Sequence, residues 1–467
     1  MTSRLADGSR ARQPRECAGA AEALELPLLH SLEGRLVLDE RRGPSQPPRT
    51  IPLAYRLRGS LSLNALRAAL DGLVRRHEAL RTTFPPGRRV QAIQPAAAVE
   101  LVVADRQGLA PADADAEVGR LLERWAALPF ERAEAPRLHA QLIRLAPDEH
   151  VLDLVVDHLV ADGWSLRVLL DDLGELYGAA VSGRPLPPSR DGLTYRDVVE
   201  EEAAILAGPE RERLLEHWRA RLDGSPPVPL LKVPPAALAE DRAPAGGVVE
   251  RELSSTLAGS LAALGRSHRV TPFVALLTVL ECVFYRLSGD RDQAVAAHVL
   301  HRDRPSTHRL VAPLADFVVI RSELDAGGTF ADAIAHVRDR TLEAFKHAAL
   351  PFGFIVRSLD PTVFGNPSFP LGVVFNMLYD ALLDESLALA GLDSIPVAET
   401  GPPPRPRGPI GVSGLATGKA MRLVVEYQQD RLRDEFVVAL LDAMESTLGA
   451  AAADPAVPLA AVPVPVV

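Results

Sequence analysis

The chain has 467 residues, of which 47% are hydrophobic and 24% charged, and its formal net charge is −10. A chain of this length exceeds the roughly 250–300 residues at which a single core stops growing, so two lobes are expected. The negative charge, without a cluster of Lys and Arg, argues against a nucleic-acid partner.

The cysteines and the hydropathy pattern bear on the compartment. The two cysteines, Cys17 and Cys282, lie far apart and predict no disulfide framework. No long apolar run and no charged-then-apolar leader occurs, which predicts a cytoplasmic protein. Residues 1–26 mix small, charged and proline residues without an apolar period, so we expect a flexible leader, with the fold beginning at Pro27.

The first periodic segments predict helices and a buried strand. Apolar residues recur at helical spacing from Leu63 to Val74, and the motif RHEALRTTF that follows predicts a strand after this helix. The apolar run VLDLVV at 151–156 predicts a strand inside a sheet that ends at Asp157. Beyond the loop HLVADGW, apolar residues from Leu166 to Tyr177 share one helical face, and Ser165 is the expected helix cap.

The segment GRPLPPSRDG at 183–192 concentrates Gly and Pro and predicts a lobe boundary, with an N-terminal lobe over 27–187 and a C-terminal lobe over 188–467. Within the second lobe, helical periodicity is found at 271–287 and 330–347, and apolar runs typical of strands at 292–300, 317–321 and 371–377. This order indicates an α/β (α+β) architecture. The proline-rich segment 396–411 is expected to be an exposed excursion.

His158 has the best context of the twelve histidines for chemistry. It directly follows the predicted buried strand and precedes a turn with Asp162 and Gly163, so a rigid scaffold would present its imidazole as a base. A metal site is not expected, because zinc sites need three or four ligands and no further His, Cys or Glu cluster lies nearby. The chain also lacks a G-x-S-x-G elbow, and GLATGK at 414–419 does not have the spacing of a phosphate loop.

The segment DHLVADGWS at 157–165 resembles the HHxxxDGWS signature of nonribosomal peptide synthetase condensation domains, with Asp157 in place of the first His. The resemblance extends over roughly residues 27–460. It includes the segments RHEALRTTF, PFERAEAPRLHAQLIRLAPDEHVL, HWRARLDGSPPVPLL, RLSGDRDQAVAAHVLHRDRP, LVAPLADFVVIRSEL, HAALPF, GNPSFPLGVVFNM and VVEYQQDRL. The opening PLLHSLEGRLV lacks the family's glutamine and tryptophan, and Asp316 stands where asparagine is commoner.

The resemblance implies two lobes like chloramphenicol acetyltransferase in a V shape, with the active site in a tunnel at their interface. It implies that His158 is catalytic, as a base or as a hydrogen-bond donor to the tetrahedral intermediate. The remaining residues that it implicates fall into two groups. Asp157, Asp162, Gly163 and Arg321 are expected to be structural at the active site, with Asp162 paired to Arg321. Ser165, Tyr195 and Asn376 are expected to pack behind the residues that face the substrate.

The function implied is transfer of an acyl, aminoacyl or peptidyl group from the phosphopantetheine thioester of a carrier protein to an amine or hydroxyl, in natural-product biosynthesis. No bound cofactor is expected. A free-standing enzyme is expected to meet its donor carrier in trans, and to use an acceptor carrier or a free nucleophile, without nucleic acid or membrane. Three alternatives stay open: an acyl-CoA-dependent acyltransferase, a non-catalytic recruitment domain, and heterocyclisation, since Asp157, Asp162 and Ser165 also satisfy the pattern DxxxxDxxS.

Overall fold

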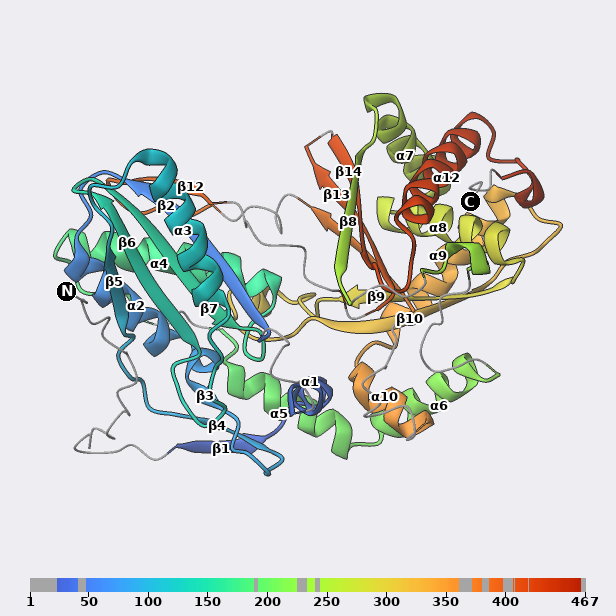
Figure 1. Cartoon of the computed structure of the whole chain (residues 1–467). Helices are drawn as coiled ribbons and strands as arrows, with labels where there is room; N and C mark the ends of the chain where they lie inside the picture. Colours follow the sequence, from blue (N-terminus) through green and yellow to red (C-terminus); the bar gives the residue numbers. More distant parts are fainter. Residues whose placement is uncertain are drawn as a thin grey trace.

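The computed structural model shows two α/β lobes side by side, joined by segments that cross between them (Figure 1). It describes residues 23–40, 48–188, 192–224, 233–239, 244–360, 372–379, 386–397, 406, 408–418 and 420–462. Most of the predicted leader, with Cys17, lies outside the described residues, as does much of the proline-rich segment.

The first lobe is built on a five-stranded sheet in the order β12-β2-β7-β6-β5. Its strands are β2 (Thr50–Arg58), β5 (Leu101–Asp105), β6 (Leu138–Ala146), β7 (Glu149–Asp157) and β12 (Asp393–Pro396). β7 is central and nearly all of its residues are buried, which confirms the strand predicted at 151–156. A smaller sheet in the order β1-β4-β3 lies beside it, with β1 (Leu24–Pro27), β3 (Thr82–Thr83) and β4 (Val90–Ile93).

Three helices cover this sheet: α2 (Leu63–Arg76), α3 (Pro111–Ala126) and α4 (Gly163–Val181). The predicted helix over Leu63–Val74 is confirmed by α2, and a short 3₁₀ turn, η1 (Glu78–Arg81), leads from it into β3. The helix predicted after HLVADGW is confirmed by α4, but its N-cap is Asp162 rather than Ser165. Ser165 occupies the third helical position and completes a capping box with Asp162, so the polar residue three positions earlier takes the cap.

The second lobe is built on a six-stranded sheet in the order β10-β9-β11-β13-β14-β8. Its strands are β8 (Gly246–Glu252), β9 (Asp292–Val299), β10 (Asp316–Glu323), β11 (Val373–Tyr379), β13 (Ile410–Thr417) and β14 (Ala420–Gln428). Its helices are α6 (Glu210–Leu222), α7 (Ser255–His268), α8 (Pro272–Ser288), α9 (Phe330–Lys346), α10 (Phe352–Leu359) and α12 (Asp434–Ala453), with 3₁₀ turns η2 (Pro235–Ala237), η3 (Pro305–Thr307) and η4 (Leu459–Ala461). These elements confirm the helices and strands predicted in this half.

The apolar helix α12 owes its composition to packing. Within the described residues it is the single helix long and apolar enough to span a membrane, while α7 and α8 meet that criterion only together, as a pair bent by 104°. Phe436 and Leu440 of α12 are fully buried in the core of the second lobe. A helix that packs against a sheet and other helices needs such an apolar surface.

The two hydrophobic cores do not follow the predicted domain limits of 1–26, 27–187 and 188–467. Strand β1 already begins at Leu24, before Pro27. Tyr195 and Val199, from α5 (Tyr195–Ala207), pack in the core of the first lobe, and the core of the second begins at Leu214. Ile205 and Leu206, at the end of α5, pack against the second core, so we propose that the lobes divide within α5.

Segments from the second half of the chain also complete the first lobe. Residues 310–314 and Leu387 and Leu389 lie in its core, and β12 pairs with β2 in antiparallel register. Helix α1 (His30–Glu40) lies between the lobes, next to α5 and α10 (Figure 1). The interface between the lobes is therefore made by residues far apart in the sequence.

Glu281 is a carboxylic acid buried in the core of the second lobe. It lies on α8 with 0% exposure, and burial raises its pKa to about 8. An unfolded glutamate titrates near 4.5, so the folded state binds an extra proton between pH 4.5 and 8. The free energy of unfolding should therefore fall as pH rises through this window, by several kcal/mol.

We expect Glu281→Gln to flatten this decline, measured by urea unfolding at intervals from pH 5 to pH 9. Burial also raises the pKa of Asp153, to about 7. In Glu281→Gln the free energy of unfolding should therefore still fall with pH below pH 7, but less steeply than in wild type. The control is Glu252→Gln at an exposed position of β8. If the free energy of unfolding falls equally steeply with pH in wild type and in Glu281→Gln, Glu281 is not neutral in the folded protein.

Candidate active site

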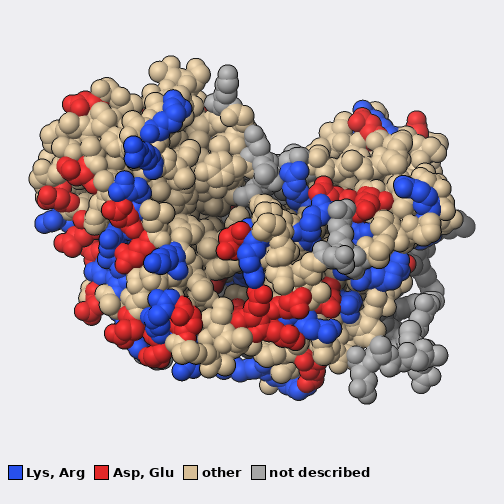
Figure 2. All heavy atoms as spheres, turned by 180° about the vertical axis from the view of Figure 1, so that it is seen from behind, with Lys and Arg blue, Asp and Glu red and all other residues tan. Residues whose placement is uncertain are grey.

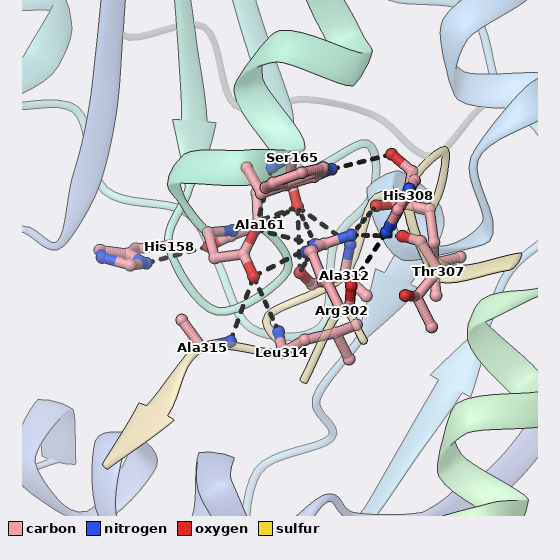
Figure 3. A network of polar contacts seen from close by, with 12 residues as sticks. His158, Ala161, Ser165, Arg302, Thr307, His308, Ala312, Leu314 and Ala315 are labelled. Carbon is pink, nitrogen blue, oxygen red and sulfur yellow. Dashed lines mark hydrogen bonds and ion pairs between the residues drawn. The ribbon is translucent and has the colours of Figure 1, made fainter. Parts of the chain in front are cut away.

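His158 is the first residue after β7 and begins the loop that leads into α4. Its backbone N–H donates to the Arg49 carbonyl at 3.2 Å, and its carbonyl accepts from Arg35 Nη1 at 3.2 Å. Its ring nitrogen Nδ1 lies 3.0 Å from the Ala161 carbonyl oxygen. The half-buried imidazole therefore has a fixed orientation, and Figure 3 shows it on the opposite side of the loop from the contacts of Arg302 and Ser165.

The Ala161 contact determines the tautomer of His158. A carbonyl oxygen can only accept a hydrogen bond, so Nδ1 must carry the proton in that contact. In the neutral ring the lone pair is then on Nε2. His158 is thus arranged to accept a proton, or a hydrogen bond from a substrate, through Nε2.

Asp157 faces into the protein. Its side chain is buried and forms an ion pair with Arg137, while Oδ1 accepts the Leu159 N–H at 2.8 Å. Arg137 is also buried and donates to the Glu131 and Glu134 carbonyls at 2.6 and 3.2 Å. Successive residues of a strand face opposite sides, so Asp157 and His158 direct their side chains apart.

Asp162 is the centre of a buried polar network. Arg302 Nη2 lies 2.9 Å from Oδ1 and 3.2 Å from Oδ2 of Asp162, and the backbone N–H groups of Leu314 and Ala315 each donate to Oδ2 at 3.1 Å. Ser165 Oγ lies 2.7 Å from Oδ1. Ser165 thus belongs to this network, whose contacts with the 307–315 segment appear in Figure 3.

The predicted pairing of Asp162 with Arg321 is wrong. Arg321 instead donates to both carboxylate oxygens of Asp292, at 2.7 and 2.8 Å, and to the Arg221 and Asp223 carbonyls at the end of α6. It stands six residues beyond Ala315 along β10, which at about 3.3 Å per residue is about 20 Å from the site of Asp162.

Arg302 is the residue that sequence reasoning missed. It lies just after β9, in the segment HRDRP that the resemblance included. Val299, the last residue of β9, pairs with Asp316, the first of β10, so Arg302 comes beside residues 312–315. Only this strand pairing reveals its partner.

Gly163 and Trp164 flank the network on its exposed side. A Cβ built on Gly163 would meet nothing within 4 Å, and its φ is not left-handed, so this glycine leaves space rather than permitting an unusual backbone angle. Trp164 Nε1 donates to the His308 carbonyl at 2.8 Å, and its ring lies over the Arg302 guanidinium. Trp164 therefore covers the ion pair, and Gly163 borders open space at the start of α4.

A second buried ion network anchors α4 further along. Asp172 accepts from His77 Nε2 at 2.9 Å and is paired with Arg76 and Arg309 at 3.0 and 2.6 Å. Burial alone would raise the pKa of Asp172, but His77 and Arg76 hold it down at about 2. The motif RHEALRTTF therefore fixes α2 to α4.

The other predicted residues lie in packed positions. Tyr195 is buried and donates to Gln91 Oε1 at 2.6 Å, and burial raises its pKa far above the usual range. Asn376 is on β11 in the second lobe, where its Oδ1 accepts the Met377 N–H. The described residues include no cluster of three or more His, Cys, Asp or Glu suited to a metal ion.

Residues 33–465 match the family model described as Condensation domain. The match covers most of the chain. The chain belongs to the condensation domain family. The condensation domain is 30% identical over 420 residues to nonribosomal peptide synthetase kk1B of Curvularia clavata, covering 88% of the chain and 3% of that protein.

It is 31% identical over 411 residues to chondramide synthase cmdD of Chondromyces crocatus, covering 87% of the chain and 10% of that protein. The chain thus spans a small part of these relatives. Among solved structures, the X-domain in complex with OxyB from teicoplanin biosynthesis has a TM-score of 0.80 at 24% identity and covers 98% of this chain and 99% of that chain. These likenesses confirm the predicted family and fold class.

Arg302, rather than Arg321, is the cation that pairs with the buried Asp162 carboxylate, and its removal should destabilise the fold. Arg302→Met should lower the free energy of unfolding by about 3–5 kcal/mol, because it leaves the Asp162 carboxylate buried without its cation. The matched variant Arg321→Met should cost much less, since its side chain is 19% exposed against 2% for Arg302. Urea unfolding at pH 7 measures both, and equal losses would contradict the assignment.

Proposed function

We propose that this condensation domain transfers an acyl, aminoacyl or peptidyl group from a carrier-protein thioester to an amine or hydroxyl acceptor. The observation that supports this most is the fixed imidazole of His158, whose Nδ1 is engaged by the Ala161 carbonyl, so that the lone pair of the neutral ring is on Nε2. Gly163, five residues further along the same loop, leaves space at the start of α4, since a Cβ there would meet nothing within 4 Å.

The proposed reaction needs one proton transfer and no covalent enzyme intermediate. The acceptor nitrogen attacks the thioester carbonyl, and His158 Nε2 takes or hydrogen-bonds the proton that the amine loses. Collapse of the tetrahedral intermediate breaks the carbon–sulfur bond, and the proton passes to the leaving thiolate. An amide forms and the carrier's phosphopantetheine thiol is released.

A carrier protein is the proposed donor partner, and the phosphopantetheine arm belongs to that partner rather than to this chain. The main contribution of such a site to the rate is to hold the two reactants close together and correctly oriented. The acceptor is a second carrier or a free nucleophile. No step of this scheme uses a metal ion or a cofactor held by the domain.

The contacts of the acidic residues argue against heterocyclisation. That alternative assigns chemistry to the pattern of Asp157, Asp162 and Ser165. Asp157 is buried against Arg137, and Asp162 and Ser165 are buried with Arg302. Carboxylates occupied in this way serve the fold rather than proton transfer to a substrate.

His158→Ala tests the proposal, with a panel of acyl-loaded carriers and nucleophiles and intact-protein mass spectrometry as the readout. We expect the rate of transfer to fall about a hundredfold or more while the melting temperature changes little, since His158 is half-buried. His268→Ala, at the end of α7, is the control. A near-wild-type rate would overturn the role of His158.

The same panel distinguishes the other functions. Transfer from acyl-CoA as fast as from the carrier would favour an acyl-CoA-dependent acyltransferase. Binding of partner proteins with no transfer from any donor would favour a recruitment domain, in the manner of the X-domain solved with OxyB.

Asp157→Asn separates condensation from heterocyclisation. The amide keeps an oxygen acceptor for the Leu159 N–H but removes the charge opposite Arg137, so stability should fall while transfer activity is retained below the lowered melting temperature. The measurement follows product mass with a cysteine-, serine- or threonine-loaded acceptor carrier. A loss of water after condensation that depends on Asp157 would establish cyclisation instead.

A further inference from the structure

The guanidinium of Arg35, on α1, contacts the ends of two strands from different lobes. Nη1 donates to the carbonyl of His158, directly after β7, at 3.2 Å. Nη2 donates to the carbonyl of Ala315, directly before β10, at 3.0 Å. The guanidinium of Arg35 thus connects His158 in the first lobe with Ala315, which lies directly before the edge strand β10 of the second lobe.

Ala315 is held from its other side by the network of Asp162. Its N–H donates to Asp162 Oδ2 at 3.1 Å, while its carbonyl accepts from Arg35. His158 is likewise held at its N–H by Arg49 and at its carbonyl by Arg35. Arg35 therefore connects His158 to the network of Asp162 and Arg302 through Ala315.

Helix α1 is itself attached to the second lobe. Glu33, which is buried, forms an ion pair with Arg357 of α10. The first N–H of α10, that of Phe352, donates to Asp316 Oδ2 at 2.8 Å, next to Ala315. These contacts anchor α1 to α10 through groups other than the two carbonyls that Arg35 holds.

We propose that Arg35 is a positioning residue for His158, which sets the distance between the imidazole and the start of β10. This inference rests on the proposed acyl-transfer function. In this proposal the position of His158 depends on a residue of α1 that lies 123 positions earlier in the chain.

The chemistry of the guanidinium suits this role. Its planar fork can donate to two acceptors in fixed directions, whereas a lysine ammonium is a point charge on a flexible stem. A displacement of about 1 Å in a reacting group can lower a rate by about a hundredfold. Replacement of Arg35 by lysine should therefore keep the positive charge but no longer fix the distance between the carbonyls of His158 and Ala315.

Arg35→Lys tests the proposal. At saturating donor and acceptor we expect kcat to fall about tenfold to a hundredfold with KM within about twofold of wild type. The control is Arg357→Gln, which breaks the ion pair of Glu33 on the same helix but leaves both Arg35 contacts intact. It should lower the melting temperature at least as much as Arg35→Lys while kcat stays within about twofold.

A second readout does not depend on turnover. Protein labelled with ¹⁵N-histidine, with the His158 signals assigned by their loss in His158→Gln, reports the protonation of Nδ1 and Nε2. We expect these signals to shift or broaden in Arg35→Lys and to stay unchanged in Arg357→Gln.

The two readouts keep the inference separate from the proposed function. Unchanged His158 signals together with a wild-type kcat in Arg35→Lys would overturn the inference. Should wild-type protein transfer no acyl group at all, the proposed function fails, and unchanged His158 signals in Arg35→Lys alone would then reject the positioning role.

Discussion

The carboxylate of Asp162 is the constraint on which the arrangement of the two lobes depends. It is 1% exposed, its partner Arg302 is 2% exposed, and it also accepts the N–H groups of Leu314 and Ala315. A buried charge is costly unless it is paired and hydrogen-bonded. The loop after β7 and the segment before β10 must therefore come together for the fold to form, and this requirement places His158 at the junction of the lobes.

The polar residues around His158 divide structural and chemical roles between them. Asp157 is neutralised by Arg137 at the beginning of the loop, and Asp162 by Arg302 at its end. His158 lies between these two ion pairs, with its ring oriented by the Ala161 carbonyl. The acids thus hold the loop in shape, which supports the proposed proton-handling role of His158. Chemistry that needs a free carboxylate at Asp157 or Asp162 would have to break a buried ion pair.

Completion of the first lobe by later segments links the site to the whole fold. Residues 310–314 enter its core, β12 extends its sheet, and Arg35 joins His158 to Ala315. A protein assembled in this way cannot present His158 correctly from the first lobe alone. The space-filling view shows the two lobes as separate masses with an indentation between them, and mixed acidic and basic side chains across the face (Figure 2).

The sequence by itself determined the local elements and the candidate base. Helical and strand periods identified α2, α4, β7 and the main elements of the second lobe, because these patterns reflect which face of each element is buried. The position of His158 after a buried strand was also readable. The partner of Asp162 was not, since the choice between Arg302 and Arg321 depends on the pairing of β9 with β10, and ion pairs between distant segments leave no periodic signal. The same reason applies to Arg137 and Arg35. The proposed division of the lobes within α5 likewise rests on packing, because Tyr195 and Val199 lie in the first core and Ile205 and Leu206 pack against the second.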